Sequence, residues 1–217
     1  MARQKSEFVK SFGTAFEIWK ALCEEVFSCG GTDDDIRRIL KDGNLRKEIA
    51  ALIMPAENAV KTLPTWKTVK LGTNLRTTDD FCIAINQANM KIGELGKNIL
   101  RRPAFKVASK ETEVELVRVT LSKLGFADLV LRKEIYDRAL ELGLELCPSE
   151  VGPQLRLQYK DQPRGERVCI AMEPLSASDG FLSVFELEHD KNGVWLNGVD
   201  GRPGSLCGGV LVFARRK

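Results

Sequence analysis

The spacing of hydrophobic residues changes near Pro103, and this change constrains the fold more than any other feature of the chain. Before Pro103, hydrophobic residues recur every three or four positions, which places them on one face of an α-helix. After Pro103, short segments alternate between apolar and polar residues and are separated by turns such as Asp179-Gly180 and Asn192-Gly193, typical of antiparallel strands. The sequence therefore predicts an α+β protein, with a helical N-terminal region over 1–105 and an α/β module with a mostly antiparallel sheet over 106–217.

Helix starts and stops can be placed within the first region. Phe12, Phe16 and Trp19 begin an apolar helical face that ends before Gly30-Gly31. Thr32 and the three aspartates that follow it predict a second helix start, because a hydroxyl and early carboxylates satisfy the free amides there. Successive helical residues point in different directions, which favours capping over a metal site for the aspartates. Ile36, Ile39 and Leu40 are expected to face inward; further helices are expected at about 45–54, from Thr78-Asp79 through Ala88, and at 92–100.

The second region is expected to combine strands with one clear helix. The helix runs over 132–142 and ends at Gly143. The segment 147–159 is ambiguous, because Pro148-Ser149-Glu150 could open a helix while Leu155, Leu157 and Tyr159 alternate as in a strand. Strands are expected at 114–121, 168–172, 182–188, 194–196 and 211–214, and a short one at 67–71.

Composition argues against several classes of function. The formal net charge of +3 is weak for a nucleic-acid binder, and no apolar run approaches the roughly 20 residues that span a bilayer. The first ten residues lack the apolar core of a secretory signal, so we expect a cytoplasmic protein that does not contact membranes, with viral or surface delivery left open.

Catalytic and metal-binding motifs are missing from the sequence. There is one histidine, His189, and six cysteines stand singly with no Cys-x-x-Cys pair, which argues against a zinc site and for buried free thiols. No Gly-x-Ser-x-Gly motif or other nucleophile-base set can be proposed. We therefore expect a protein that is not an enzyme and needs no cofactor or metal.

The segment Asn197–Val210, NGVDGRPGSLCGGV, is unusual because it holds five glycines between two apolar, strand-like segments. Its attachment to a strand at each end predicts an ordered loop displayed at the surface. Every residue type in it can be reached from an asparagine codon by changing only the two adenines, and Lys, Glu, Gln, Met and Trp, which cannot be reached, do not occur. A flexible glycine-rich hairpin loop is the alternative interpretation.

The stretch from Val114 to Lys217 resembles the variable proteins of diversity-generating retroelements, which have a C-type lectin fold. The similarity lies in the helix ending in Leu142–Leu144, the Pro148 turn towards a second helix, the strand Val194–Leu196 before the unusual segment, and the final residues from Val212. In that family a reverse transcriptase copies a template with adenine-specific errors into the end of the gene. The resemblance implies a lectin-like scaffold that presents altered side chains to a ligand, often another protein.

Carried over by position, the resemblance assigns ten candidate ligand contacts to this chain. They are Asn197, Gly198, Val199, Asp200, Arg202, Gly204, Ser205, Leu206, Cys207 and Gly208. Trp195 is expected to pack at the base of this surface. The segment departs from the family in having no aromatic residue between Asn197 and Val210.

Two further questions stay open at the level of the sequence. A small DNA-binding regulator with a helix-turn-helix, formed around 36–54 or 132–142, is the alternative function, although Asp33–Asp35 would repel phosphates. Salt-dependent binding to random duplex DNA distinguishes the two functions, because it is expected of the DNA-binding regulator and not of the ligand-binding protein. The helical region 1–105 could attach the module to a larger particle or form a homo-oligomer through its amphipathic faces.

Overall fold

The computed structural model describes residues 12–53, 63–177 and 179–216. It separates into two compact units, Met1–Met54 and Pro55–Lys217. We expected the second domain to begin at 106, whereas the unit that contains the sheet already includes the residues from Pro55 onward. The reason is visible in the core, where Phe81, Ile85 and Ile99 are fully buried in the same cluster as the strand residues.

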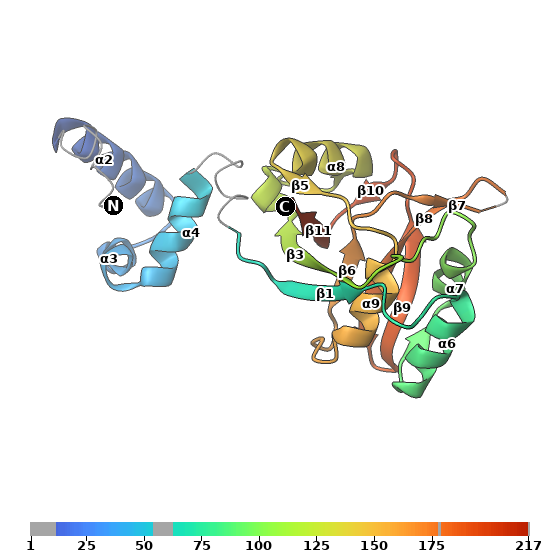
Figure 1. Ribbon diagram of the computed structural model, residues 1–217. Coiled ribbons are helices and arrows are strands. Elements are labelled where there is room, and N and C mark those ends of the chain that lie inside the picture. Colours follow the sequence, from blue (N-terminus) through green and yellow to red (C-terminus); the bar gives the residue numbers. More distant parts are fainter. Residues whose placement is uncertain (1–11, 54–62, 178, 217) are drawn as a thin grey trace. The chain divides into compact units, whose positions relative to one another are not determined.

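The first unit contains helices α2 (Phe12–Ser28), α3 (Asp33–Lys41) and α4 (Gly43–Ile53) (Figure 1). Capping by aspartate is confirmed for α3, because the backbone N–H of Thr32 donates to Oδ2 of Asp35 at 2.9 Å. Ile36 is buried as expected, but Leu40 is 74% exposed. Phe16 and Trp19 on α2 are exposed as well, so the apolar face of α2 is not buried within the described part of this unit.

The second unit is built around a nine-stranded sheet with the order β1-β3-β11-β6-β8-β9-β2, in which β5 also pairs with β11 and β7 with β8. Among the named strands of the residues that the structure describes, only the pairs β11–β6 and β2–β9 are parallel, which confirms a mixed helix-and-sheet protein with a mostly antiparallel sheet. The strands are β1 (Lys67–Leu71), β2 (Lys91–Ile92), β3 (Thr112–Thr120), β5 (Leu144–Glu145), β6 (Arg167–Ile170), β7 (Leu175–Ser176), β8 (Leu182–Asp190), β9 (Gly193–Asp200) and β11 (Val210–Arg215). A separate two-stranded sheet joins β4 (Val130–Leu131) to β10 (Leu206–Cys207).

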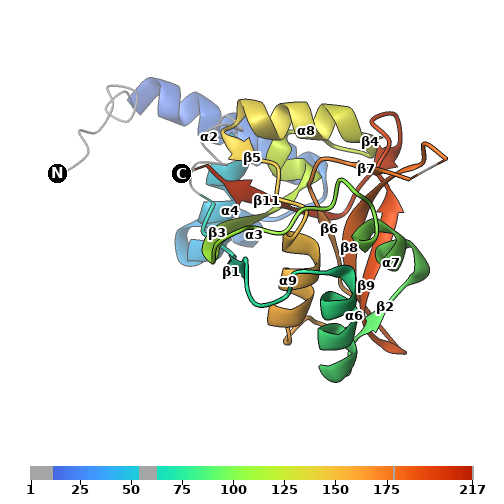
Figure 2. The ribbon, with the colours of Figure 1, turned by 45° about the vertical axis from the view of Figure 1, so that its right-hand side comes forward.

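Helices cover both faces of the sheet. They are α6 (Thr78–Gln87), α7 (Glu94–Leu100), α8 (Arg132–Glu141) and α9 (Val151–Gln158), with a 3-10 turn at Leu121–Leu124 (Figure 2). Tyr136 of α8 packs edge-on against Phe213 of β11, and Gly152 of α9 lies against Phe185 of β8. Because alternate strand residues point to opposite faces, the pairing register places Phe213 and Phe185 on different sides of the sheet. Helix α8 therefore covers one face, and α9 covers the other together with α7.

The ambiguous segment 147–159 folds as a helix over most of its length. Pro153 lies in the first turn of α9, where a missing N–H removes no helical hydrogen bond. A side-chain carbon at Gly152 would lie 2.4 Å from the Phe185 ring, so glycine allows α9 to approach the sheet closely. Gly152 and Pro153 are thus both compatible with α9, and Gly152 contributes to its packing on the sheet. Among the described helices, none is both long and apolar enough to cross a membrane.

The start of α6 offers a direct test of a local stabilising contact. Thr77, one residue before the expected cap, accepts a hydrogen bond from the backbone N–H of Asp80 at 3.1 Å, and Asp80 accepts from the backbone N–H of Thr77 at 2.8 Å. We expect Thr77→Ala to lower the free energy of unfolding by about 1 kcal/mol, because it removes one half of this capping box. Thr77→Ser keeps the hydroxyl and is the matched control in urea unfolding; equal losses in both variants would contradict the capping role.

Candidate ligand-binding surface

The predicted contact segment 197–208 is ordered but is not a continuous loop. Its first four residues extend β9, and the pairing with β8 continues as far as Asp200 opposite Ser183. Residues 201–205 then form a loop, and Leu206 pairs with Leu131 in the small β4–β10 sheet. The expectation of a loop starting at Asn197 was therefore wrong for Asn197–Asp200, because glycine and polar residues do not prevent a strand whose partner β8 is long.

The main chain of this segment is anchored at several points. The backbone N–H groups of Arg132 and Lys133 donate to the carbonyl oxygens of Ser205 (2.9 Å) and Pro203 (3.0 Å). These N–H groups open α8 and have no partner inside the helix, so the loop backbone satisfies them. The Arg132 side chain also donates to the carbonyl oxygen of Asp200 at 2.8 Å. These contacts hold the loop through its backbone and do not depend on the identity of most of its side chains.

The ten predicted contacts differ in their exposure. Arg202, Gly204 and Leu206 are exposed; Asn197, Gly198, Val199, Asp200, Ser205 and Gly208 are half-buried; Cys207 is buried. Cys207 is therefore not available as a surface contact, and the prediction is wrong for this residue. Cys207 faces the interior because it neighbours Leu206 on a strand, where side chains alternate in direction.

Gly198 also has a structural role that the sequence did not reveal. A side-chain carbon there would lie 2.7 Å from Cδ1 of Ile99 and 2.8 Å from Cγ of Leu95, both on α7. A side-chain carbon at Gly96 would lie 2.4 Å from the carbonyl oxygen of Leu196. This pair of glycines lets α7 lie directly on β9, so position 198 cannot accept larger side chains without moving the helix.

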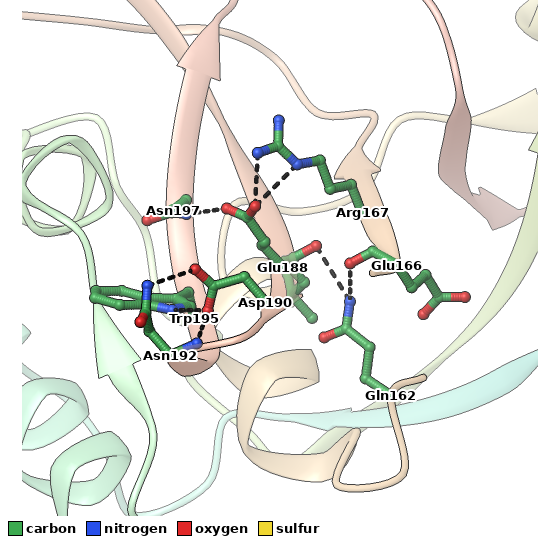
Figure 3. A network of polar contacts seen from close by, with 9 residues as sticks. Gln162, Glu166, Arg167, Glu188, Asp190, Asn192, Trp195 and Asn197 are labelled. Atoms are coloured by element: carbon green, nitrogen blue, oxygen red, sulfur yellow. Dashed lines mark hydrogen bonds and ion pairs between the residues drawn. The ribbon is translucent and has the colours of Figure 1, made fainter. Parts of the chain in front are cut away.

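Asn197 and Trp195 belong to a network of polar contacts at the other end of β9 (Figure 3). Glu188 accepts hydrogen bonds from Arg167 Nε at 2.9 Å and from Asn197 Nδ2 at 2.8 Å. Trp195 donates from its ring N–H to Asp190 at 2.9 Å and is half-buried. It lies near the start of β9, whereas the 201–205 loop follows the end of that strand. The network holds the Asn197 side chain in one orientation rather than leaving it free.

Asp200 and Arg202 form an ion pair with Nη2 and Oδ2 2.6 Å apart. The hydrogen bond from Arg202 holds the pKa of Asp200 below its usual range. A ligand that uses either residue as a polar contact must compete with this pair.

An exposed apolar cluster adjoins the same segment. Leu206 is 66% exposed and Leu129 is 62% exposed, and both flank Leu131 on the β4–β10 sheet. Leu129 lies over Gly208, where a side-chain carbon would be 2.2 Å from Cδ2 of Leu129. Neighbouring exposed apolar residues with a polar rim are typical of a protein interaction site.

A pocket of about 220 Å³ lies beside the point where the loop is bonded to α8. Tyr136 and Leu140 of α8 line it on one side, and Gly201 and Pro203 of the loop line it on the other. Arg132 reaches it as well and is buried. The helical pattern predicted the position of Arg132 and Tyr136 on α8, but no sequence signal indicated that they lie beneath the contact segment.

Groups of three or more histidine, cysteine, aspartate or glutamate side chains close enough to hold a metal ion do not occur among the described residues. Comparison with known proteins gives no match to a family model, to a curated protein or to a solved structure.

Proposed function

We propose that this chain is a ligand-binding protein that presents a diversified surface on a lectin-like scaffold, as the target protein of a diversity-generating retroelement. The observation that carries the proposal is the backbone anchoring of the 201–205 loop by the first N–H groups of α8. A loop held through its main chain keeps its course when its exposed side chains are exchanged, which is what diversification requires. The proposal assigns the protein no catalysis and no cofactor.

The arrangement of the sheet supports the same proposal. The segment leaves β9 and returns as β11, which lies between β3 and β6 inside the sheet. Both ends of the displayed residues are therefore fixed to strands with buried neighbours such as Leu196 and Leu211. A rigid support of this kind lowers the entropy lost on binding.

The proposed contacts are fewer than the ten residues that the family resemblance assigns. Arg202, Gly204 and Leu206 are the exposed members, and Asn197, Val199, Asp200, Ser205 and Gly208 form a half-buried margin. Leu206 with Leu129 and Leu131 supplies the apolar centre that a protein ligand would cover. We therefore propose a protein as the ligand.

The helical unit 1–54 is proposed to attach the display unit to a second copy or to a larger particle. The proposal rests on the exposed apolar side chains of α2, namely Phe16, Ile18, Trp19 and Phe27. Its test is the oligomeric state of the full chain in analytical ultracentrifugation, before and after Trp19→Lys.

Tolerance of the displayed positions is the first test of the proposed function. We expect the double variant Gly204→Asn with Leu206→Tyr to change the free energy of unfolding by less than about 1 kcal/mol, because Gly204 faces open space and Leu206 is exposed. Both new residues can be encoded by adenine-directed changes. Urea unfolding of the full chain measures the change.

The matched control is Val212→Asn, at a fully buried position of β11, where we expect a loss of more than about 3 kcal/mol. A loss of that size in the double variant would show that the segment is packed rather than displayed, and would contradict the proposal.

The proposal also makes a genomic prediction. A near-copy of the codons for 197–210, with adenines at the divergent sites, is expected beside a reverse transcriptase gene. A complete genomic locus that contains neither the near-copy nor a reverse transcriptase gene would also contradict the proposed function.

A further inference from the structure

A pocket of about 290 Å³ is lined by α7, the residues that follow it, and the segment that contains β7. Three cations lie in its lining, Lys97, Arg101 and Arg102, together with the Ser176 side of β7. None of its lining residues also lines the pocket beside the 201–205 loop, and none is among the ten predicted ligand contacts. The pocket is therefore separate from the proposed display site.

Arg102 is the buried member of the three cations, with 5% of its surface exposed. Its Nε donates to Oδ1 of Asn98 at 3.1 Å, and its Nη2 donates to the hydroxyl of Ser183 at 3.1 Å. Its Nη1 donates to the carbonyl oxygen of Leu175. All three acceptors are neutral, so they hold the guanidinium in place without balancing its charge. A guanidinium has five N–H donors, and two of those on Arg102 have no acceptor among the described residues.

The pocket carries more positive than negative charge. Glu94 is the one acid among its lining residues, so three cations against one carboxylate leave a formal excess of two positive charges. Burial lowers the pKa of Arg102 and the charge of Asp179 raises it, but a guanidinium stays protonated at neutral pH. Within the described part of the chain, no carboxylate lies within ion-pair distance of the three cations.

The end of a helix explains only part of this arrangement. Lys97 and Arg101 lie near the C-terminal end of α7, where cations interact favourably with the helix dipole. Their four-residue spacing also places two like charges side by side, which is unfavourable on a helix surface. The dipole gives no reason to bury Arg102, and a buried cation costs free energy unless an anion pairs with it. The three cations together therefore fit an anion that binds from solution.

We propose that this pocket binds a small phosphate monoester. Such a group carries about −1.5 to −2 charges at pH 7, which matches the two excess positive charges of the lining. The planar guanidinium groups of Arg101 and Arg102 suit phosphate oxygens, because each can donate two parallel N–H bonds. Arg102 is held in advance by its three hydrogen bonds, which lowers the entropy lost on binding.

The size of the pocket limits the rest of the ligand. Its volume of about 290 Å³ lies at the lower end of the range of roughly 300–1,000 Å³ that is usual for small-molecule sites. A phosphate group with a short polar chain fits this volume better than a large cofactor does. This inference does not rest on the proposed display function, because the two sites share no residue.

Isothermal titration calorimetry of the full chain with glycerol 3-phosphate, at pH 7.5 and constant ionic strength, tests the proposal. We expect one saturable site with a Kd below about 1 mM. The double variant Lys97→Gln with Arg101→Gln is expected to raise the Kd at least about tenfold, because each cation contributes a charge-assisted contact. Its matched control is Lys106→Gln with Lys110→Gln, which removes the same charge from two exposed residues outside the pocket and is expected to change the Kd less than about twofold.

Competition experiments identify the recognised group. Inorganic phosphate is expected to compete for the site, whereas dimethyl phosphate, a diester with a single charge, is expected to bind at least about tenfold more weakly than glycerol 3-phosphate. Equal losses in the two double variants would show general charge attraction and would overturn the proposal, as would the absence of saturable binding. Random duplex DNA that binds more tightly than glycerol 3-phosphate, and loses its binding in the Lys97 and Arg101 variant, would overturn it in favour of a nucleic-acid contact.

Discussion

Replacing Gly96 by alanine is expected to lower the free energy of unfolding by about 2–3 kcal/mol. The new carbon would lie 2.4 Å from the carbonyl oxygen of Leu196 and 3.2 Å from its carbonyl carbon. The obstructing atoms belong to the backbone of β9, so no side-chain rotation relieves the contact and α7 must move away from the strand. Ile99, which is fully buried on α7, would move with it.

Helix propensity alone predicts the opposite sign for this substitution. Alanine is favoured over glycine within a helix by about 1 kcal/mol, so a measured loss reports the contact with β9 and not the helix itself. Gly204→Ala is the matched control, because nothing lies within 4 Å of the carbon that it adds. Urea unfolding of both variants makes the comparison; a stabilised Gly96→Ala would show that α7 is not seated on β9 as described.

Replacing Glu150 by alanine is expected to lower the free energy of unfolding by about 3–5 kcal/mol. This carboxylate is 1% exposed and accepts hydrogen bonds from the backbone N–H groups of Gly72 (2.8 Å) and Ala108 (2.7 Å) and from Gln154 Nε2 (2.9 Å). Its removal leaves backbone donors from two separate connecting segments without a partner in the protein interior. Each buried donor left unpaired costs about 1–3 kcal/mol.

Two control variants test whether the expected loss of stability comes from the buried hydrogen bonds of Glu150 or from the removal of a carboxylate in general. Glu145→Ala removes an acid that is about half exposed and paired with Arg216, and its expected effect is below about 0.5 kcal/mol. Glu150→Gln keeps one acceptor oxygen for one of the two amides, and its expected loss lies between those of the two alanine variants. Equal stability of Glu150→Ala and Glu145→Ala in urea unfolding would show that the buried network contributes nothing.

The close packing of α7 on β9 at Gly96 and Gly198 also limits which positions can vary under the proposed diversification. Most exposed positions of the segment can vary without disturbing the frame, whereas Gly198 is held to a small residue by Leu95 and Ile99. Under the proposed function, sequence variants of this gene should therefore diverge at Arg202 and Leu206 and retain glycine at 198.

Local patterns in the sequence determined the secondary structure of much of the chain. The helical spacing around Ile135 and Ala139 predicted α8, and the alternation around Val117 predicted β3; both elements lie where they were expected. The aspartates after Thr32 predicted the start of α3. These elements can be predicted from sequence because the residues on one face of a helix or strand recur at a fixed spacing, and this spacing appears as a pattern of apolar residues along the chain.

Only the tertiary structure decided which elements share a core and which side chains meet. The sequence predicted the helices that contain Phe81 and Ile99, but no local sequence pattern indicated that these helices pack on the sheet. The hydrogen bond from Arg132 to the carbonyl oxygen of Asp200 and the contact of Gly198 with α7 both join segments that are distant in sequence. Such contacts depend on the strand order, in which β11 lies between β3 and β6, and a repeat of two or four residues carries no information about that order.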